Sequence, residues 1–343
     1  RHSAKMTFWL PALALPLTLA FQPGPPRGAP QRLPKRLPSD VLVCGVNFPS
    51  CRLSGRTVPP VALLRTRERV QVITDIDDTI KSSGGVALAG IPLGGVDTSF
   101  SRGACYPGVF QFGAELSRHG AGRVPMNVAV LTARAREFIW ALEIKQSDKI
   151  CQGFRQAGED SGLRDWGIGP VLYGSVAEWI CQERKGWRKY ENFKVLYARS
   201  EPNQRFVFVG DNGSSEKDLE AAEMIIRDFP HALRAVFVHA VSSKQQPAPL
   251  PEDSDINGVP VVYFRTYASA ASKAVKLGLM RAVGARRVLK AVEVEMKSDP
   301  INIAKGSSNE RLLIDELSEA RAALSIGMAV TKRARRLLRR GAK

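Results

Sequence analysis

Two carboxylates separated by one residue follow directly after a short β-branched run. The run is Val70–Thr74, and Asp75, Asp77 and Thr79 come next. If the run is a buried strand, Asp75 and Asp77 lie at its carboxyl end, where open α/β sheets bind ligands. Two anions this close repel each other unless a cation lies between them or one binds a proton. The pattern therefore predicts a hard divalent metal and a nucleophilic carboxylate, with a solvated acidic turn as the alternative.

Three later segments carry polar side chains suited to the same chemistry. Thr132 ends the apolar run Val128–Thr132 and could donate a hydrogen bond to a phosphoryl oxygen. Lys189 lies near the start of a helical stretch and could neutralise negative charge. Asp211 ends an apolar strand, and the glycines around it let the backbone approach a ligand closely. Taken alone, Thr132 is a common strand-end threonine and Lys189 a common solvated lysine. Because these segments follow one another at successive strand ends, the sequence favours a single site.

Apolar runs alternate with helical stretches from Val70 onward, which is typical of a parallel sheet with helices on both faces. The expected strands are Val70–Thr74, Val128–Thr132, Val171–Tyr173, Phe206–Gly210 and Ala235–Val238, with Val261–Tyr263 as a last edge strand and two short strands, Val41–Val46 and Val61–Leu64, before them. The expected helices are Pro107–His119, Arg136–Gln152, Gly186–Arg199 and Glu216–Phe229.

The motifs together resemble those of the haloacid dehalogenase superfamily phosphatases. More narrowly, they are similar to the catalytic domain of the fungal actin-patch-associated phosphatidate phosphatase family. The resemblance covers about residues 68–240 and implies a three-layer, Rossmann-like α/β fold of the haloacid dehalogenase type with a minimal cap. The matching segments are Asp75–Ile80, Tyr106–Val109, Leu131–Thr132, Lys189 with Phe193, and Gly210–Gly213.

The resemblance implies a role for each matched residue. Asp75 would attack phosphorus and form an aspartyl-phosphate, while Asp77 would protonate the leaving alkoxide and then activate water. Thr132 and Lys189 would bind the phosphoryl oxygens. The implied cofactor is Mg²⁺, held by Asp75, Asp211, the Asp77 backbone carbonyl, a phosphoryl oxygen and waters.

Two of these assignments have competitors within the sequence. Lys189 is favoured over Lys185 because Phe193 follows it by four residues, as in the family pattern. The family has an acidic residue five positions after its last aspartate, and Glu216 stands there. Asp218 fits better if two residues are inserted, so we expect Asp218 to be a further metal ligand.

The net charge of +17 is carried by the two ends of the chain. Residues 1–39 hold six Lys/Arg and no acid, residues 271–343 hold 17 Lys/Arg against seven Asp/Glu, and the centre holds 27 against 26. A neutral centre argues against specific nucleic-acid binding. The pattern of residues 271–343 predicts a helical extension whose basic faces contact an anionic membrane. A solvated or disordered tail is the alternative, and contact of the tail with nucleic acid is a lesser one.

The substrate is expected to be a phosphorylated lipid. A short apolar insert, residues 84–95, separates the first two motifs and leaves no room for a large cap, so the site should be open to a bulky or membrane-presented substrate. A plain hydrophobic loop packed on the core is the alternative interpretation of this insert. Together with the resemblance, this predicts Mg²⁺-dependent hydrolysis of phosphatidate to diacylglycerol and phosphate. Soluble phosphomonoesters or phosphoproteins are the alternative substrates, and a non-catalytic membrane-docking protein is the alternative of another class.

The first residues resemble a targeting signal. Phe8–Ala20 is apolar but short for a membrane span, and an acid-free Pro/Arg-rich stretch follows it to Pro38. This predicts entry into the secretory pathway or a secondary plastid, with an untargeted disordered leader as the alternative. The expected division is a leader (1–39), short strands or a linker (40–67), the catalytic domain (68–245), a Pro-rich loop with the edge strand (246–270) and the basic tail (271–343).

The five cysteines do not form a zinc-binding pattern. Their number is odd, none forms a CxxC pair and histidine is scarce. Cys44 and Cys51 could pair in an oxidising lumen, but unpaired core residues are the favoured interpretation.

Overall fold

The computed structural model describes residues 68–85, 87–88, 91–92, 95–118, 124–135, 147–175, 182–213, 217–241 and 249–340. The chain divides into two compact units, Arg1–Pro60 and Val61–Lys343, and every described residue belongs to the second. The targeting segment, the two expected early strands, Glu216 and the cysteine pair Cys44 and Cys51 lie outside the described residues.

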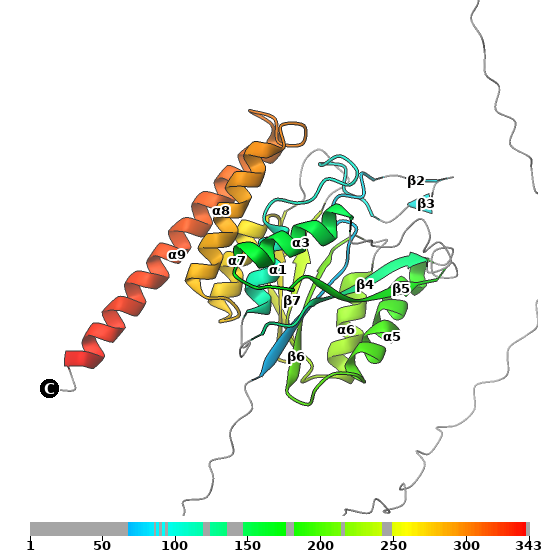
Figure 1. Ribbon diagram of the computed structural model, residues 1–343, viewed down its shortest axis with the longest axis horizontal. Coiled ribbons are helices and arrows are strands. Elements are labelled where there is room, and N and C mark those ends of the chain that lie inside the picture. Colours follow the sequence, from blue (N-terminus) through cyan, green and yellow to red (C-terminus); the bar gives the residue numbers. More distant parts are fainter. Residues whose placement is uncertain are drawn as a thin grey trace, which may run out of the picture. The chain divides into compact units, whose positions relative to one another are not determined.

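A seven-stranded sheet forms the centre of the second unit (Figure 1). Its strand order is β5-β4-β1-β6-β7-β9-β8, and the strands pair in parallel except β8, which is antiparallel to β9. The strands are β1 (Arg69–Thr74), β4 (Val128–Ala135), β5 (Ile168–Gly174), β6 (Gln204–Asp211), β7 (Leu233–His239), β8 (Ser254–Ile256) and β9 (Val259–Phe264). A separate two-stranded antiparallel sheet pairs β2 (Ala87–Leu88) with β3 (Ile91–Pro92).

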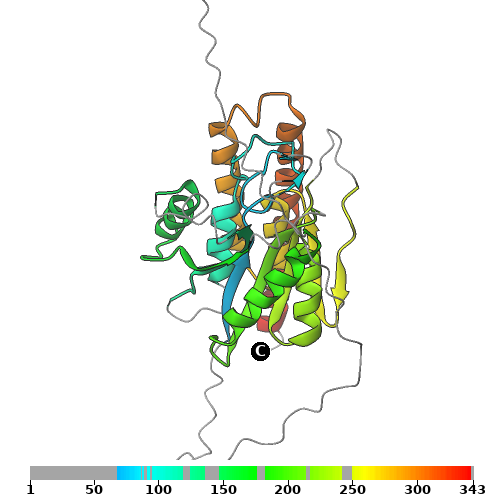
Figure 2. The ribbon, with the colours of Figure 1, turned by 90° about the vertical axis from the view of Figure 1, so that its right-hand side faces the viewer.

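Helices cover both faces of this sheet, which makes three layers (Figures 1 and 2). The helices are α1 (Val109–Ser117), α3 (Lys149–Asp160), α5 (Lys185–Tyr197), α6 (Asp218–Asp228), α7 (Tyr267–Lys276), α8 (Ala282–Ser298) and α9 (Ser308–Arg340), with a short 3₁₀ turn, η2 (Gln182–Arg184).

The central strands of the large sheet contribute side chains alternately to two separate cores. In β1, Val72 joins the core formed with α1, α3, α7, α8 and α9, whereas Ile73 joins the core formed with α5 and α6. The same alternation places Val130 and Leu131 of β4 in different cores. Because both faces of a central parallel strand are buried, its sequence is a continuous apolar run, which is how these strands were predicted.

The helices expected after Ser272 are present, and much of their length belongs to the body of the fold. Val288 and Val292 of α8 are fully buried in the same core as β1. Leu313 and Leu324 of α9 join that core as well. The boundaries of the sequence-based domain division remain a prediction.

Two expected elements differ from the structure. The strand expected at the edge, Val261–Tyr263, lies inside β9, and the edge is β8, in the stretch expected to be a loop. The reason is a hairpin whose turn residues, Asn257 and Gly258, both have positive φ (52° and 83°), the conformation that Asn-Gly pairs favour in two-residue hairpins. The second is the helix expected over Arg136–Gln152. Its described part is the start of α3 at Lys149, and α3 continues past the expected end to Asp160.

None of the described helices has the length and apolar character that a membrane crossing requires.

Replacing Gly108 with alanine should destabilise the fold at the contact between α1 and α8. Gly108 has φ +84°, and a Cβ there would lie 2.4 Å from Cγ2 of Val292. Left-handed backbone costs an alanine about 1–2 kcal/mol, and overpacking adds about 1–3 kcal/mol. Gly162→Ala is the matched control, because Gly162 has φ +71° with nothing within 4 Å of the added Cβ. Urea unfolding should show a clearly larger loss for Gly108→Ala, and equal losses would contradict this packing.

Candidate active site and metal centre

The candidate site lies where the order of the strands reverses. From β1 the chain proceeds outward to β4 and β5, then returns to β6 on the other side of β1 and proceeds to β7 and β9. Open α/β sheets bind ligands at such a point, outside the carboxyl ends of the strands. Asp75 follows the last residue of β1, and Asp211 is the last residue of β6, so the topology alone brings these two side chains together.

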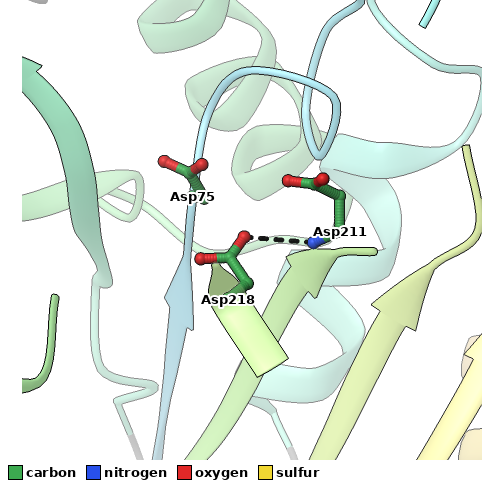
Figure 3. A group of neighbouring side chains, drawn as sticks. All are labelled: Asp75, Asp211 and Asp218. Atoms are coloured by element: carbon green, nitrogen blue, oxygen red, sulfur yellow. Dashed lines mark hydrogen bonds between the residues drawn. The ribbon is translucent and has the colours of Figure 1, made fainter. Parts of the chain in front are cut away.

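Three buried carboxylates meet at this point (Figure 3). Asp75, Asp211 and Asp218 are 1%, 1% and 2% exposed, and one oxygen of each lies within 4.8 Å of those of the others. Asp218 begins α6, and its Oδ2 accepts the backbone N–H of Asp211 at 3.1 Å. Three carboxylates in this arrangement could hold a metal ion.

Two glycines make room for the acidic group. A Cβ on Gly210 would lie 2.6 Å from both Cβ and Oδ2 of Asp218, and one on Gly213 would lie 2.6 Å from Oδ1 of Asp211. The backbone N–H of Gly213 also donates to that oxygen at 2.6 Å. The carboxylates of Asp218 and Asp211 therefore lie so close to the backbone that a side chain at Gly210 or Gly213 would clash with them.

Lys189 is the cation within this group. Its side chain is fully buried, and its Nζ donates to Oδ2 of Asp75 at 2.8 Å and to Oδ1 of Asp218 at 2.5 Å. Lys189 thus joins α5 to the end of β1 and to the start of α6. Lys185, the competing lysine, is also buried and is the first residue of α5.

The charges of the group fit a hard divalent cation. Asp75, Asp211 and Asp218 carry three formal negative charges, and Lys189 places one positive charge among them. Like charges this close repel each other, and a bound cation would lower that repulsion. An all-oxygen donor set is the type that Mg²⁺, Ca²⁺ and Mn²⁺ prefer, so the geometry indicates a hard cation without selecting its identity.

Asp77, two residues after Asp75, lies outside this acidic group and is paired with Arg134. Nε and Nη2 of Arg134 donate to the two oxygens of Asp77 at 3.0 and 2.9 Å. Burial opposes the charge of Arg134, but the attraction of Asp77 and Asp75 outweighs it and raises the pKa of the guanidinium. Sequence reasoning did not assign a function to Arg134, although its position two residues after Thr132 on a strand end was the available signal.

Thr132 is buried at the end of β4, and its Oγ1 accepts the backbone N–H of Arg134 at 3.2 Å. The hydroxyl hydrogen is therefore available to donate elsewhere. The structure brings together four of the six predicted site residues: Asp75, Lys189, Asp211 and Asp218. Asp77 lies outside this group. Arg134 joins Asp77 to the end of β4, where Thr132 lies.

Asp78 holds the following loop in place, a function that the sequence reasoning did not assign. Its backbone is left-handed (φ 58°), and its carboxylate accepts the backbone N–H groups of Ser83, Val96 and Asp97 at 2.8, 2.5 and 2.9 Å. Burial raises the pKa of Asp78, and the hydrogen bonds act in the opposite direction. Asp97 in turn accepts the hydroxyl of Tyr106 at 2.7 Å. These bonds fix the segment that leads from β1 to α1.

The two C-terminal helices reach the same segment. The backbone N–H of Ser101 donates to Oδ1 of Asn302 at 2.6 Å, and Nδ2 of Asn309 donates to the carbonyl of Ser99 at 2.8 Å. Glu295 of α8 accepts the backbone N–H of Gly108 at 2.9 Å. The connection between α8 and α9 therefore supports the loop that Asp78 anchors.

No protein-family model, no curated protein and no solved structure matches this chain. The findings of the structure are a mostly parallel three-layer α/β fold and a buried acidic group suited to a metal ion.

Replacing Lys189 with methionine should destabilise the protein most when no divalent cation is present. Removing one partner of a buried ion pair costs about 3–5 kcal/mol because the remaining charge is uncompensated. Added Mg²⁺ should recover part of this loss by supplying the missing positive charge. Urea unfolding in EDTA and in Mg²⁺ measures both effects.

Lys194→Met is the matched control for this substitution. Lys194 lies on the same helix and pairs with Glu191 at 2.6 Å, but its side chain is 39% exposed. Exposed pairs contribute at most about 1 kcal/mol. Equal losses for the two variants, or no dependence on Mg²⁺ for Lys189→Met, would contradict the account of the buried group.

Proposed function

We propose that this protein is a Mg²⁺-dependent phosphatase that cleaves phosphomonoesters through an aspartyl-phosphate. The observation that carries the proposal is the group of Asp75, Asp211 and Asp218 around Lys189 at the reversal point of the sheet. A nucleophilic carboxylate beside a cation and a metal-binding group is what attack on a phosphate dianion requires, because the two anions otherwise repel.

In the proposed first step, an oxygen of Asp75 attacks phosphorus and the bond to the leaving oxygen breaks. Asp77 donates its proton to that oxygen, so the alcohol departs neutral. In the second step, Asp77 takes a proton from water, the hydroxide attacks the aspartyl-phosphate, and Asp75 is released with inorganic phosphate. The side chain of Asp77 is 16% exposed, whereas that of Asp75 is 1% exposed. The greater exposure of Asp77 suits its proposed role, because this carboxyl must contact both the leaving alcohol and water.

Thr132 and Lys189 are proposed to bind the phosphoryl oxygens during transfer. Both side chains are buried, so their hydrogen bonds act in a medium of low polarity, where they are strong. Asp75, Asp211 and Asp218, with the backbone carbonyl of Asp77, would hold the metal ion. When bound, the ion would supply positive charge that reduces repulsion between the carboxylate and the phosphoryl group.

Phosphatidate is the substrate that we favour. The resemblance to the phosphatidate phosphatase family supports it, as does the small size of the β2–β3 hairpin between the first two motifs. Residues 332–340 hold six Lys/Arg and no acid, and each such charge near an anionic membrane contributes about 1 kcal/mol. A basic end of α9 is therefore proposed to hold the protein on the membrane that presents the lipid.

The test is phosphate release from phosphatidate in mixed micelles. Wild-type protein should release phosphate in Mg²⁺ and not in EDTA, and Asp75→Asn should lower the rate by at least about 10³-fold because the nucleophile is lost. Asp160→Asn, an exposed aspartate at the end of α3, is the control and should leave the rate unchanged.

The alternatives give different results in the same assay. Asp75-dependent turnover of an aryl phosphate without turnover of phosphatidate would assign soluble substrates. No turnover of either by folded protein would favour a non-catalytic membrane-docking protein. Membrane contact is measured by sedimentation with phosphatidylserine vesicles: binding should fall in high salt and in a variant with Arg335, Arg336, Arg339 and Arg340 replaced by Gln. Binding that is indifferent to both would contradict the membrane proposal.

A further inference from the structure

Positive charge gathers around Asp77 beyond what that carboxylate can neutralise. Lys81 is the β-bridge partner of Asp77, and the carbonyl of Lys81 accepts the backbone N–H of Asp78 at 2.7 Å. Residues paired across a bridge project to the same face, so the side chain of Lys81 is placed beside that of Asp77. Arg134 approaches the same carboxylate from β4.

A third cation is held next to this pair by the loop that follows the hairpin. Lys81 forms a second bridge with Cys105, which fixes the end of this loop against it. Arg102 lies three residues earlier and packs on Gly84, where an added Cβ would lie only 2.8 Å from Cβ of Arg102. Arg102 is exposed and Lys81 half-buried, so both can be reached from solvent.

The charge balance of the three cations is uneven. Arg134 is matched by Asp77 through two hydrogen bonds, and the nearby charge of Asp75 is matched by Lys189. Within the described part of the chain, neither Lys81 nor Arg102 forms an ion pair with a carboxylate. Lys81 also lies close to Arg134, which carries a like charge, and a bound anion would relieve their repulsion.

We propose that Lys81 and Arg102, beside Arg134, form a subsite for a second oxyanion next to the scissile phosphate. This inference rests on the proposed phosphatase activity and narrows its substrates: the preferred ones present a phosphate or carboxylate near the leaving oxygen. Asp77 locates the subsite, because it is the group that gives its proton to that oxygen. The second anion therefore belongs on the leaving-group side of the scissile bond.

The second oxyanion has two chemical sources. In a soluble substrate it is a further anionic group on the leaving alcohol. In a membrane it is the headgroup of a neighbouring anionic lipid, since the glycerol of phosphatidate carries no other charge. The experiment has one arm for each source.

The soluble arm compares 3-phosphoglycerate with glycerol 3-phosphate, which differ by a carboxylate on the leaving alcohol. Wild-type protein should prefer 3-phosphoglycerate by about tenfold or more in kcat/KM, the scale of a charge-assisted contact. Lys81→Met and Arg102→Met should each reduce this ratio several-fold. Arg102 is exposed, so its substitution keeps the test valid if Lys81→Met does not fold.

Arg164→Met is the matched control. Arg164 is exposed and lies with Arg69 and Gly169 at the amino ends of the strands, away from the site. Its substitution removes the same charge and should leave the ratio unchanged. A loss of preference in this variant equal to that in Lys81→Met would show a general charge effect and overturn the subsite.

The lipid arm measures phosphatidate hydrolysis in micelles of phosphatidylcholine and of phosphatidylglycerol. If a neighbouring headgroup is the second anion, phosphatidylglycerol should raise the hydrolysis rate of the wild-type protein more than that of Lys81→Met. The basic end of α9 is intact in both proteins, so a difference between them does not come from membrane binding by α9. A Lys81-dependent preference in the soluble arm alone assigns the second anion to the substrate molecule itself.

The outcomes separate the subsite from the phosphatase activity. Turnover with no preference in either arm, or with a preference that Lys81→Met and Arg102→Met leave intact, overturns the subsite and keeps the phosphatase. If nothing is turned over, calorimetric titration of the Asp75→Asn protein in Mg²⁺ with 3-phosphoglycerate and with glycerol 3-phosphate decides. Tighter binding of 3-phosphoglycerate that Lys81→Met abolishes in this background keeps the subsite, and equal binding of the two compounds overturns it.

Discussion

The constraint on which this structure depends is the crowding of three buried carboxylates around one lysine. Asp75, Asp211 and Asp218 come from three different segments, and Lys189 donates to two of them. Like charges this close repel each other, and a metal ion bound among them would lower that repulsion, so metal binding would also stabilise the fold. The lack of a side chain at Gly210 follows from the same constraint, because any Cβ there would meet the carboxylate of Asp218.

The topology of the sheet brings the carboxylates together, and hydrogen bonds in the following loop stabilise this arrangement. Parallel strands β1 and β6 end at the same edge, at the reversal of strand order where open α/β sheets bind ligands. Asp78 binds three backbone N–H groups of the following loop. Asn302, between α8 and α9, and Asn309, in α9, hydrogen-bond to that loop at Ser101 and Ser99. The C-terminal helices thus contribute to the surroundings of the site, a function separate from the membrane contact proposed for the end of α9.

The sequence predicted the strands and the residues of the acidic group because both depend on local patterns. A continuous apolar run identifies a buried parallel strand, and the polar residue after it is placed by the strand itself, as for Asp75 and Asp211. The pairing of Arg134 with Asp77 could not be predicted, since it joins residues 57 positions apart in the chain. The burial of α8 depends on long-range packing in the same way. The edge strand β8 differs, because its turn residues Asn257 and Gly258 are a local pattern that can be read from the sequence.

The central proposal is that the acidic group, which could hold a metal ion, binds one hard divalent cation. Calorimetric titration of the metal-free full-length protein with Mn²⁺ and Mg²⁺ tests it without reference to any substrate. The account predicts one ion per chain and a loss of at least about 100-fold in affinity for Asp211→Asn, since removal of even an outer partner of a metal ligand costs 10–100-fold. Absence of binding, or binding that Asp211→Asn leaves unchanged, would contradict the account.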